Sequence, residues 1–265
     1  MLRAENLHLA VPGRTLCRDL NVAMQSGQCW GVLGRNGCGK STLLQVLSGL
    51  TKPAGGTAWL GERPLRAWPR RELAARLGVL LQEEDNGYIG SVQEYVATGR
   101  FPHIAGMGGF GAEDATATAT ALRQLRLEPL AQRPLHTLSG GERQRARIAM
   151  LLAQAPDVYC LDEPLLHLDI NHQIEIMQLF RDLASLHGKT VVMVLHDPWW
   201  ARRFCDHVLL MYDNGEVASG AGSALLTADR LESLYQCGMQ QVLAERGMDF
   251  APANDSGLPK QGGMR

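Results

Sequence analysis

The chain has 265 residues, of which 45% are apolar, so most of it cannot be disordered and it suits one large α/β domain or a core domain with a smaller subdomain. The 26 basic and 27 acidic residues give a formal net charge of -1, which disfavours nucleic acid as the main partner. Six cysteines form no Cys-x-x-Cys pair, which indicates reduced thiols in a cytoplasmic protein. The apolar runs fall short of the roughly 18 residues that a membrane-spanning helix needs, so we expect another component to hold the chain if it works at a membrane.

The first third of the chain predicts strands that lead into a glycine-rich loop. Residues 2 to 9 and 15 to 24 alternate apolar and polar side chains, as strands do. The strand "CWGVLG" runs into the loop, and a helix over Lys40–Gly49 follows. A hairpin-like stretch "GGTAWLGERPL", a short helix from about Pro69 and a buried strand over Leu77–Gln82 come next.

The middle of the chain, from about Asp85 to Leu135, loses the strand pattern and predicts a helical insertion. It includes "SVQEYVATG" and a long helix over Glu113–Leu127. The alternation "ATATATA" within that segment resembles a strand, but its alanines favour a helix and no turn residues bound it. We therefore expect a helical unit between two α/β portions.

The last third returns to α/β order. The strands "DVYCLDEP", "TVVMVLHD" and "HVLLMYDNGEVASG" alternate with helices, one of them over Asn171–His187. The triplet Asp213-Asn214-Gly215 predicts a tight turn between two strands. The end of the chain is rich in Pro, Gly, Asn and Ser, and this composition predicts no fixed structure.

The loop "GRNGCGKST" has the spacing of a phosphate-binding loop, with Gly34, Gly39, Lys40 and Ser41 at the defining positions. Its glycines permit a tight turn whose amides face phosphates, the lysine neutralises phosphate oxygens and the serine hydroxyl ligates Mg²⁺. A strand before the loop and a helix after it give the required context. A dinucleotide site is disfavoured because no third glycine stands in register, so hydride transfer is excluded.

Polar side chains follow three predicted strands. Asp162 and Glu163 end "DVYCLDEP", and because neighbouring side chains of a strand point to opposite faces, we expect the first to face a metal and the second an attacking water. His196 ends the next strand, and parallel order would set it beside these carboxylates. Gln82 ends "LGVLLQ" in the same manner.

A second glycine pair stands in "LSGGERQ", over residues 138–144. Ser139 and Glu142 form a capping box that by itself requires only the start of a helix. A single nucleotide needs one glycine-rich cradle, so the residues alone leave the role of the second pair open.

Taken together, these motifs resemble the nucleotide-binding subunits of ATP-binding cassette (ABC) transporters over about Leu2 to Gly238. The matching motifs, in order, are "GRNGCGKST" as Walker A, Gln82 as the Q-loop, "LSGGERQ" as the family signature, "YCLDEP" as Walker B, "HLD" ending at Asp169 as the D-loop, and His196 as the switch histidine. The resemblance implies a P-loop NTPase core with an antiparallel β subdomain over 1–84 and 157–244, and a helical subdomain with the signature over 85–156. Residues 245–265 would form a disordered tail.

The resemblance also implies ATP and Mg²⁺ as cofactors and assigns roles to residues. Glu163 polarises the attacking water, His196 contacts the γ-phosphate, and Gln82 senses the nucleotide. The expected Mg²⁺ ligands are Ser41, Gln82 and Asp162. The expected ATP-binding residues are Gly34, Arg35, Asn36, Gly37, Cys38, Gly39, Lys40, Ser41, Thr42, Ser139, Gly140, Gly141 and Asp169.

In that family two subunits pack head to tail, and each signature closes over the ATP held by its partner. The resemblance thus implies a homodimer that drives membrane permease subunits, and indirectly a periplasmic substrate-binding protein, from the cytoplasmic face of the inner membrane, without nucleic acid. "VATGRFPH" over Val96 to His103 and the segment after His196 are most similar to ATPases of iron-siderophore, haem and cobalamin importers. An ABC ATPase for another cargo, or a soluble one outside transport, is the alternative.

The chain departs from the family pattern at several positions, which include Val11 and Cys38. Where the family has an aromatic residue that stacks on adenine, this chain has Val11. Cys38 lies inside the phosphate loop near a helix N-terminus, where we expect a lowered pKa and a reactive thiol.

Overall fold

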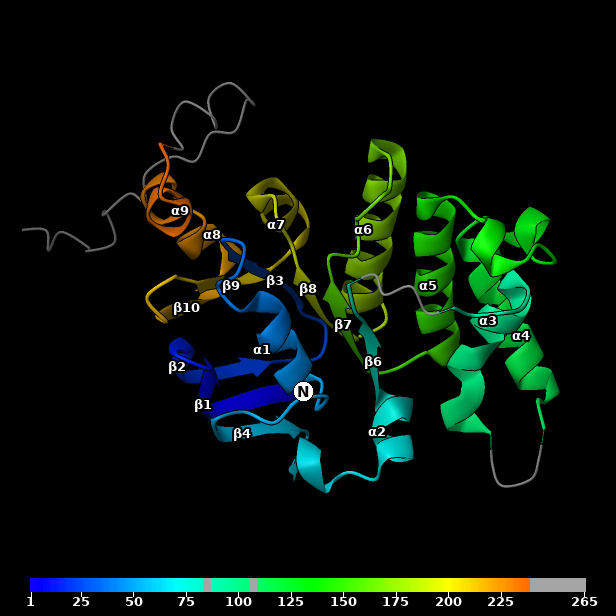
Figure 1. Ribbon diagram of the computed structural model, residues 1–265, viewed down its shortest axis with the longest axis horizontal. Helices are drawn as coiled ribbons and strands as arrows, with labels where there is room; N and C mark the ends of the chain where they lie inside the picture. The colour runs from blue at the N-terminus through cyan, green and yellow to red at the C-terminus, as the bar shows by residue number, and fades with distance from the viewer. Residues whose placement is uncertain (83–86, 105–108, 239–265) are drawn as a thin grey trace, which may run out of the picture.

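The computed structural model describes residues 1–82, 87–104 and 109–238, and these build two sheets with helices around them (Figure 1). The first sheet is antiparallel, in the order β2-β1-β4-β5. Its strands are β1 (Leu2–Val11), β2 (Arg14–Met24), β4 (Gly55–Leu60) and β5 (Arg63–Pro64). The alternation that predicted the first two strands is present as burial: Leu2, Ala4, Leu7 and Leu9 of β1 are buried.

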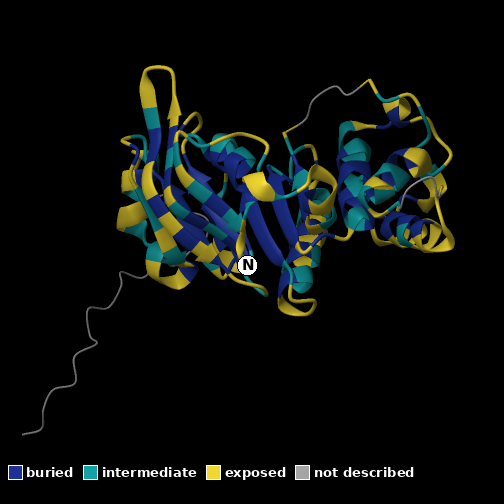
Figure 2. Cartoon of the chain, turned by 90° about the horizontal axis from the view of Figure 1, so that it is seen from below, coloured by how far each residue is buried: buried dark blue, intermediate teal, exposed yellow. Residues whose placement is uncertain are grey.

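The second sheet has the order β10-β9-β3-β8-β7-β6 and is parallel except for β10. Its strands are β3 (Cys29–Gly34), β6 (Leu77–Leu80), β7 (Val158–Asp162), β8 (Thr190–Val194), β9 (His207–Met211) and β10 (Val217–Ala221). Every residue of β3, β7 and β8 is buried, and Figure 2 shows this sheet as the buried centre of the molecule. Burial on both faces explains why these strands read as continuous apolar runs.

Helices cover both faces of the parallel sheet. α1 (Lys40–Leu47) lies between the two sheets and contacts both. α6 (Ile170–Ser185) and α7 (Pro198–Phe204) cover the other face. The remaining short helices are α2 (Arg70–Arg76), α8 (Gly222–Leu225) and α9 (Ala228–Tyr235). Strand β3 divides the core, since Trp30 and Val32 pack with α1 whereas Cys29 and Leu33 pack on the opposite face.

The helices α3 (Val92–Ala97), α4 (Ala112–Gln124) and α5 (Gly140–Gln154) pack on one another beside the sheet, and the first two lie within the stretch from Asp85 to Leu135 that was predicted to be helical. The "ATATATA" segment lies in α4, so the helical interpretation is confirmed. The ion pair between Arg100 and Asp114 at 2.8 Å, with both side chains nearly buried, joins the segment before α4 to its first turn.

No helix within the described residues is both long and apolar enough to cross a membrane. The tail predicted over 245–265 lies outside those residues.

Candidate functional site

The phosphate loop begins where β3 ends and turns directly into α1. Gly39 adopts φ 108, a conformation that side chains disfavour, and a Cβ there would lie 3.0 Å from the side chain of Leu16. Gly34 has even less room, since a Cβ would meet the Met211 carbonyl oxygen at 2.5 Å. Glycine is thus required at both ends of the loop by the close approach of β2 and β9.

Lys40 stands at the first position of α1 and is 6% exposed. Its Nζ donates hydrogen bonds to the carbonyl oxygens of Gly34 at 2.8 Å and Arg35 at 2.9 Å. The ammonium is therefore folded back over the loop, where the N-terminus of the helix also favours negative charge.

Cys38 differs from the sequence expectation. Its side chain is 1% exposed, and burial raises the pKa of the thiol, which outweighs the nearby Lys40 charge that lowers it. The prediction of a lowered pKa was wrong because it counted the helix N-terminus and left out desolvation.

Asp162 ends β7 beside the loop. It is 3% exposed, and burial raises the pKa of its carboxyl group while a hydrogen bond with Ser41 lowers it. Its Oδ1 is buried and has no hydrogen-bond partner among the described residues. A buried carboxylate oxygen without a donor is costly unless a cation or water satisfies it.

Glu163 lies beyond the end of β7 and adopts φ 50, so the strand alternation expected for it does not apply. Its Oε1 lies 2.7 Å from Nε2 of His196. β8 pairs in parallel with β7, and this adjacency brings the histidine to the carboxylate as the sequence predicted. The Glu163 side chain is 14% exposed and that of His196 is 49% exposed, so the pair is buried on one side and open on the other.

A cavity of about 510 Å³ brings together Lys40, Glu163 and His196, whereas Asp162 is not among its described lining residues. Its lining residues are Val11, Arg14, Leu16, Asn36, Gly37, Gly39, Lys40, Ser41, Thr42, Gln82, Glu163 and His196. Among the predicted ATP-binding residues of the loop, Gly34, Arg35 and Cys38 do not line it. Arg14 and Leu16 were missed by sequence reasoning, although both stand near Val11, the position at which the chain departs from the family.

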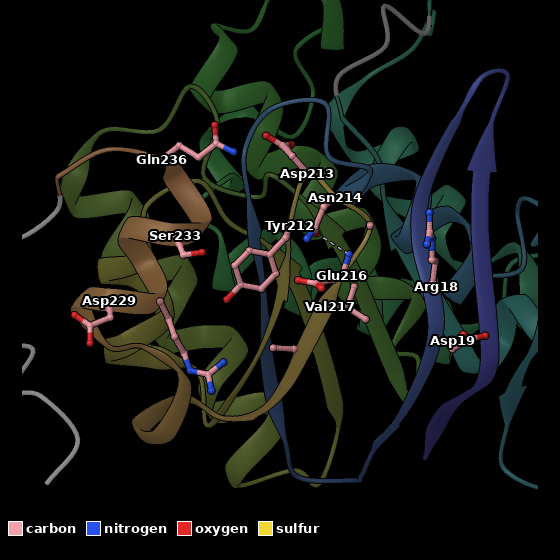
Figure 3. A pocket seen from close by; sticks show the side chains of 13 residues that line it. Arg18, Asp19, Tyr212, Asp213, Asn214, Glu216, Val217, Asp229, Ser233 and Gln236 are labelled. Atoms are coloured by element: carbon pink, nitrogen blue, oxygen red, sulfur yellow. Dashed lines mark hydrogen bonds between the residues drawn. The ribbon is translucent and has the colours of Figure 1, made fainter. Parts of the chain in front are cut away.

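A separate cavity of about 840 Å³ lies between β2, the turn after β9 and α9 (Figure 3). Arg18, Glu216 and Asp229 are among the charged residues that line it. Asp213 lines this cavity and also reaches the phosphate loop, since it pairs with Arg35 at 2.7 Å. Among the described residues, the two cavities share no lining residue, and neither Lys40 nor Glu163 lines the larger one.

The second glycine pair begins α5. Ser139 Oγ accepts from the Glu142 amide at 3.3 Å, and Glu142 Oε2 accepts from the Ser139 amide at 2.8 Å, so the predicted capping box is confirmed. The Ser139 amide and the Ser139 hydroxyl, which donates to the same Oε2 at 2.9 Å, both lower the pKa of the Glu142 carboxyl group. Gly141 is close to the loop before α6, because a Cβ would lie 2.9 Å from the His167 carbonyl oxygen.

Neither the signature nor Asp169 lines the phosphate cavity of this chain, as far as the described residues go. Asp169 caps α6 by accepting from the His172 amide at 3.0 Å and pairs with Nδ1 of the same histidine at 2.7 Å. The structure thus brings together the Walker A, Walker B, Gln82 and His196 groups and keeps the signature apart from them.

This arrangement defines a class of protein, the P-loop ATPases, which hydrolyse a nucleotide at the carboxyl edge of a parallel sheet. Comparison with known proteins gives the family. Residues 17–166 match the model of the family described as ABC transporter, and the chain belongs to that family.

Relatives cover most of the chain. The ferric enterobactin transport ATP-binding protein FepC of Escherichia coli is 39% identical over 234 residues, which are 88% of this chain and 86% of that protein. The hemin import ATP-binding protein HmuV of Pseudomonas aeruginosa is 38% identical and covers 93% of this chain and 95% of its own.

Solved structures agree with these relatives. A metal-chelate type ABC transporter in an inward-facing conformation matches with a TM-score of 0.77 and 31% identity, over 88% of each chain. A dimeric ATP-binding cassette bound to ADP and Pi matches with a TM-score of 0.73 and 27% identity, over 83% of this chain and 98% of that one. The predicted family, fold class and ATPase activity are confirmed.

Proposed function

We propose that this chain is the ATP-hydrolysing subunit of an importer that takes up a metal chelate of the iron-siderophore, haem or cobalamin type. The observation that carries the proposal is similarity over nearly the full length to ATP-binding subunits named for ferric enterobactin and hemin transport, which cover 88% and 93% of the chain.

We assign Mg²⁺ to Ser41, Asp162 and Gln82. The unpartnered, buried Oδ1 of Asp162 and the hydroxyl hydrogen-bonded to its carboxyl group supply the oxygen donors that Mg²⁺ prefers. Gln82 lines the same cavity as Ser41 and adds an amide oxygen. When bound, Mg²⁺ neutralises charge on the phosphate oxygens.

In the reaction, Lys40 and the loop amides hold the phosphates, and Glu163 accepts a proton from the water that attacks the γ-phosphorus. The His196 imidazole is within hydrogen-bond distance of the Glu163 carboxylate, at 2.7 Å, which supports a role in orienting it. With ATP in the cavity, the exposed side of the imidazole is the one that reaches the γ-phosphate. Positioning and charge stabilisation dominate phosphoryl transfer, so these residues need no covalent step.

We further propose that two copies pack head to tail, with Ser139, Gly140 and Gly141 of each closing over the ATP of the other. Two observations support this arrangement. The start of α5, with amides at a helix N-terminus suited to a phosphate, does not line the phosphate cavity of its own chain among the described residues. A similar cassette forms a dimer with ADP and Pi. Asp169, which caps the helix after the Walker B segment, is assigned to the same dimer interface.

The other partners follow from the importer proposal. We assign residues 1–84 and 157–244 to the ATPase core and 85–156 to a helical subdomain that contacts the permease together with Gln82. The subunit then acts at the cytoplasmic face of the inner membrane as a peripheral protein, and a periplasmic binding protein delivers the cargo. The names of the import relatives support this assignment.

The test is affinity purification of the tagged full-length chain from membranes of its native host, with identification of the co-purifying permease and any bound chelate. We expect an iron-siderophore, haem or cobalamin permease and Mg²⁺-dependent ATP hydrolysis. Co-purification of a permease for any other cargo would refute the metal-chelate proposal. An active ATPase that never associates with membranes would refute the transport function itself.

A further inference from the structure

The phosphate cavity has two chemically different ends. Lys40, Ser41 and Glu163 line the phosphate end, whereas Val11 and Arg14 line the end at the tip of the β1–β2 hairpin. A nucleotide held by its phosphates at the first end extends its base toward the second. No Phe, Tyr or Trp is among the described residues that line the cavity.

Hydrogen bonds donated by the nitrogen atoms of its guanidinium group hold Arg14 at that end of the cavity. Its Nη1 donates to the Gly37 carbonyl oxygen at 3.2 Å, and its Nη2 lies 3.4 Å from both the carbonyl oxygen and Oδ1 of Asp213. A guanidinium group makes its hydrogen bonds in its plane, so these contacts fix the plane and occupy its edges. The flat face of the guanidinium group is therefore the part that a ligand can contact. The Arg14 side chain is 44% exposed.

Val11 completes the surface. It is paired with Arg14 across the hairpin, lines the same cavity and is 42% exposed. The guanidinium plane offers a flat cationic surface, and the aliphatic side chain beside it offers an apolar contact. Both suit the face of a purine ring better than its hydrogen-bonding edge.

We infer that Arg14 is the base platform of this ATPase: its guanidinium face stacks on the purine of the bound nucleotide, in place of an aromatic ring. The inference rests on the proposed nucleotide site. Because the N–H groups of the guanidinium are already hydrogen-bonded to Gly37 and Asp213, Arg14 makes no hydrogen bond to the edge of the base. Stacking accepts any base, so ATP and GTP bind with similar affinity.

The experiment measures binding of ADP, GDP and inorganic pyrophosphate to the full-length chain by titration calorimetry. Pyrophosphate is the base-free counterpart of ADP and reports only the phosphate end. We expect wild-type affinities for ADP and GDP within about threefold of each other, and we expect Arg14→Ala to weaken both by about fivefold or more while pyrophosphate binding stays within about twofold.

Two further substitutions separate the plane of the guanidinium from its charge. Arg14→Trp restores stacking and should return ADP affinity to within about threefold of the wild type, whereas Arg14→Lys keeps the charge without the plane and should stay weak. Arg18→Ala is the matched control, because Arg18 is an exposed arginine of the same strand that lines the other cavity (Figure 3).

Several results would overturn the inference. They are equal losses of ADP and pyrophosphate binding in Arg14→Ala, full binding by Arg14→Lys, or a wild-type preference above about tenfold for one purine. Wild-type protein that binds neither ADP nor pyrophosphate would instead refute the proposed function, so the two failures are distinguishable.

Discussion

Two capping boxes in this chain have nearly the same geometry, and they allow a controlled test of the signature. Ser91 begins α3 and Ser139 begins α5. The hydroxyl oxygen accepts from the glutamate amide at 3.2 Å in the first and 3.3 Å in the second, and the returning carboxylate bonds are 2.7 and 2.8 Å long. A substitution of either serine therefore removes the same local interaction.

The perturbation is an arginine at each position, Ser91→Arg and Ser139→Arg. Loss of an N-cap costs about 1 kcal/mol of the free energy of unfolding. In a chain of this size we expect each variant to lower the melting temperature by about 2 to 4 °C, measured by calorimetry. Because the two boxes match, the thermal shifts should agree with each other.

The variants should differ in dimerisation. In a Glu163→Gln background, which slows hydrolysis, sedimentation with ATP and Mg²⁺ should give a dimer for Ser91→Arg and a monomer for Ser139→Arg. The reason is that a bulky cation at the start of α5 blocks the approach of the partner's ATP, while the cavity of its own chain is untouched. ATP affinity of the monomer should stay within about twofold of the wild type.

An ATP-driven dimer of the Ser139→Arg variant, equal to that of the Ser91→Arg variant, would refute the head-to-tail arrangement. Loss of the dimer in both variants would show that the effect is general destabilisation and would equally refute the reasoning.

Three further outcomes are expected. Glu163→Gln should lower the rate of ATP hydrolysis by about 10²- to 10⁴-fold with nucleotide binding retained, whereas the matched change Glu175→Gln, a carboxylate of α6 paired with Arg126, should leave the rate unchanged. Hydrogen bonds lower the pKa of Glu142 in the folded chain, so its contribution to stability is present above its unfolded pKa and is lost as the pH falls through the folded value; Glu142→Gln should flatten the acid side of the stability curve, and a curve of unchanged shape would contradict this. Burial raises the pKa of the Cys38 thiol, so maleimide labelling followed by mass spectrometry should modify the exposed Cys237 well before it; rapid labelling of the phosphate loop would contradict that expectation.

The sequence predicted those parts of the site that depend on strand order. The meeting of Glu163 and His196 follows from parallel strands that end at one edge, and β7 and β8 are indeed neighbours. The tight turn at Asp213-Asn214-Gly215 does join β9 and β10. Boundaries were less accurate: the strand predicted over Leu77–Gln82 ends at Leu80, which leaves Gln82 in the following loop.

Two features could not be predicted because they depend on tertiary contacts. Glu163 adopts a left-handed backbone after the strand, and nothing in the local pattern distinguishes this from one more strand residue. Arg14 pairs with Asp213 across 199 positions of sequence, and exposed arginines and aspartates are too common for a single sequence to pair them. The prediction of a lowered pKa for Cys38 was wrong for a related reason, since burial depends on the whole fold.

The contacts made by the end of α9 have a consequence for synthesis. Gln236 accepts from Arg35 of the phosphate loop at 2.7 Å across 201 positions, and the Tyr235 hydroxyl donates to the His196 carbonyl oxygen at 3.2 Å. Ribosomes add about 5 to 20 residues per second, so about 10 to 40 s pass between the synthesis of Arg35 and that of Gln236. A nascent chain therefore carries its phosphate loop long before the residues that brace it exist, and ribosome-bound chains that stop before α9 should hold nucleotide less tightly than the finished protein.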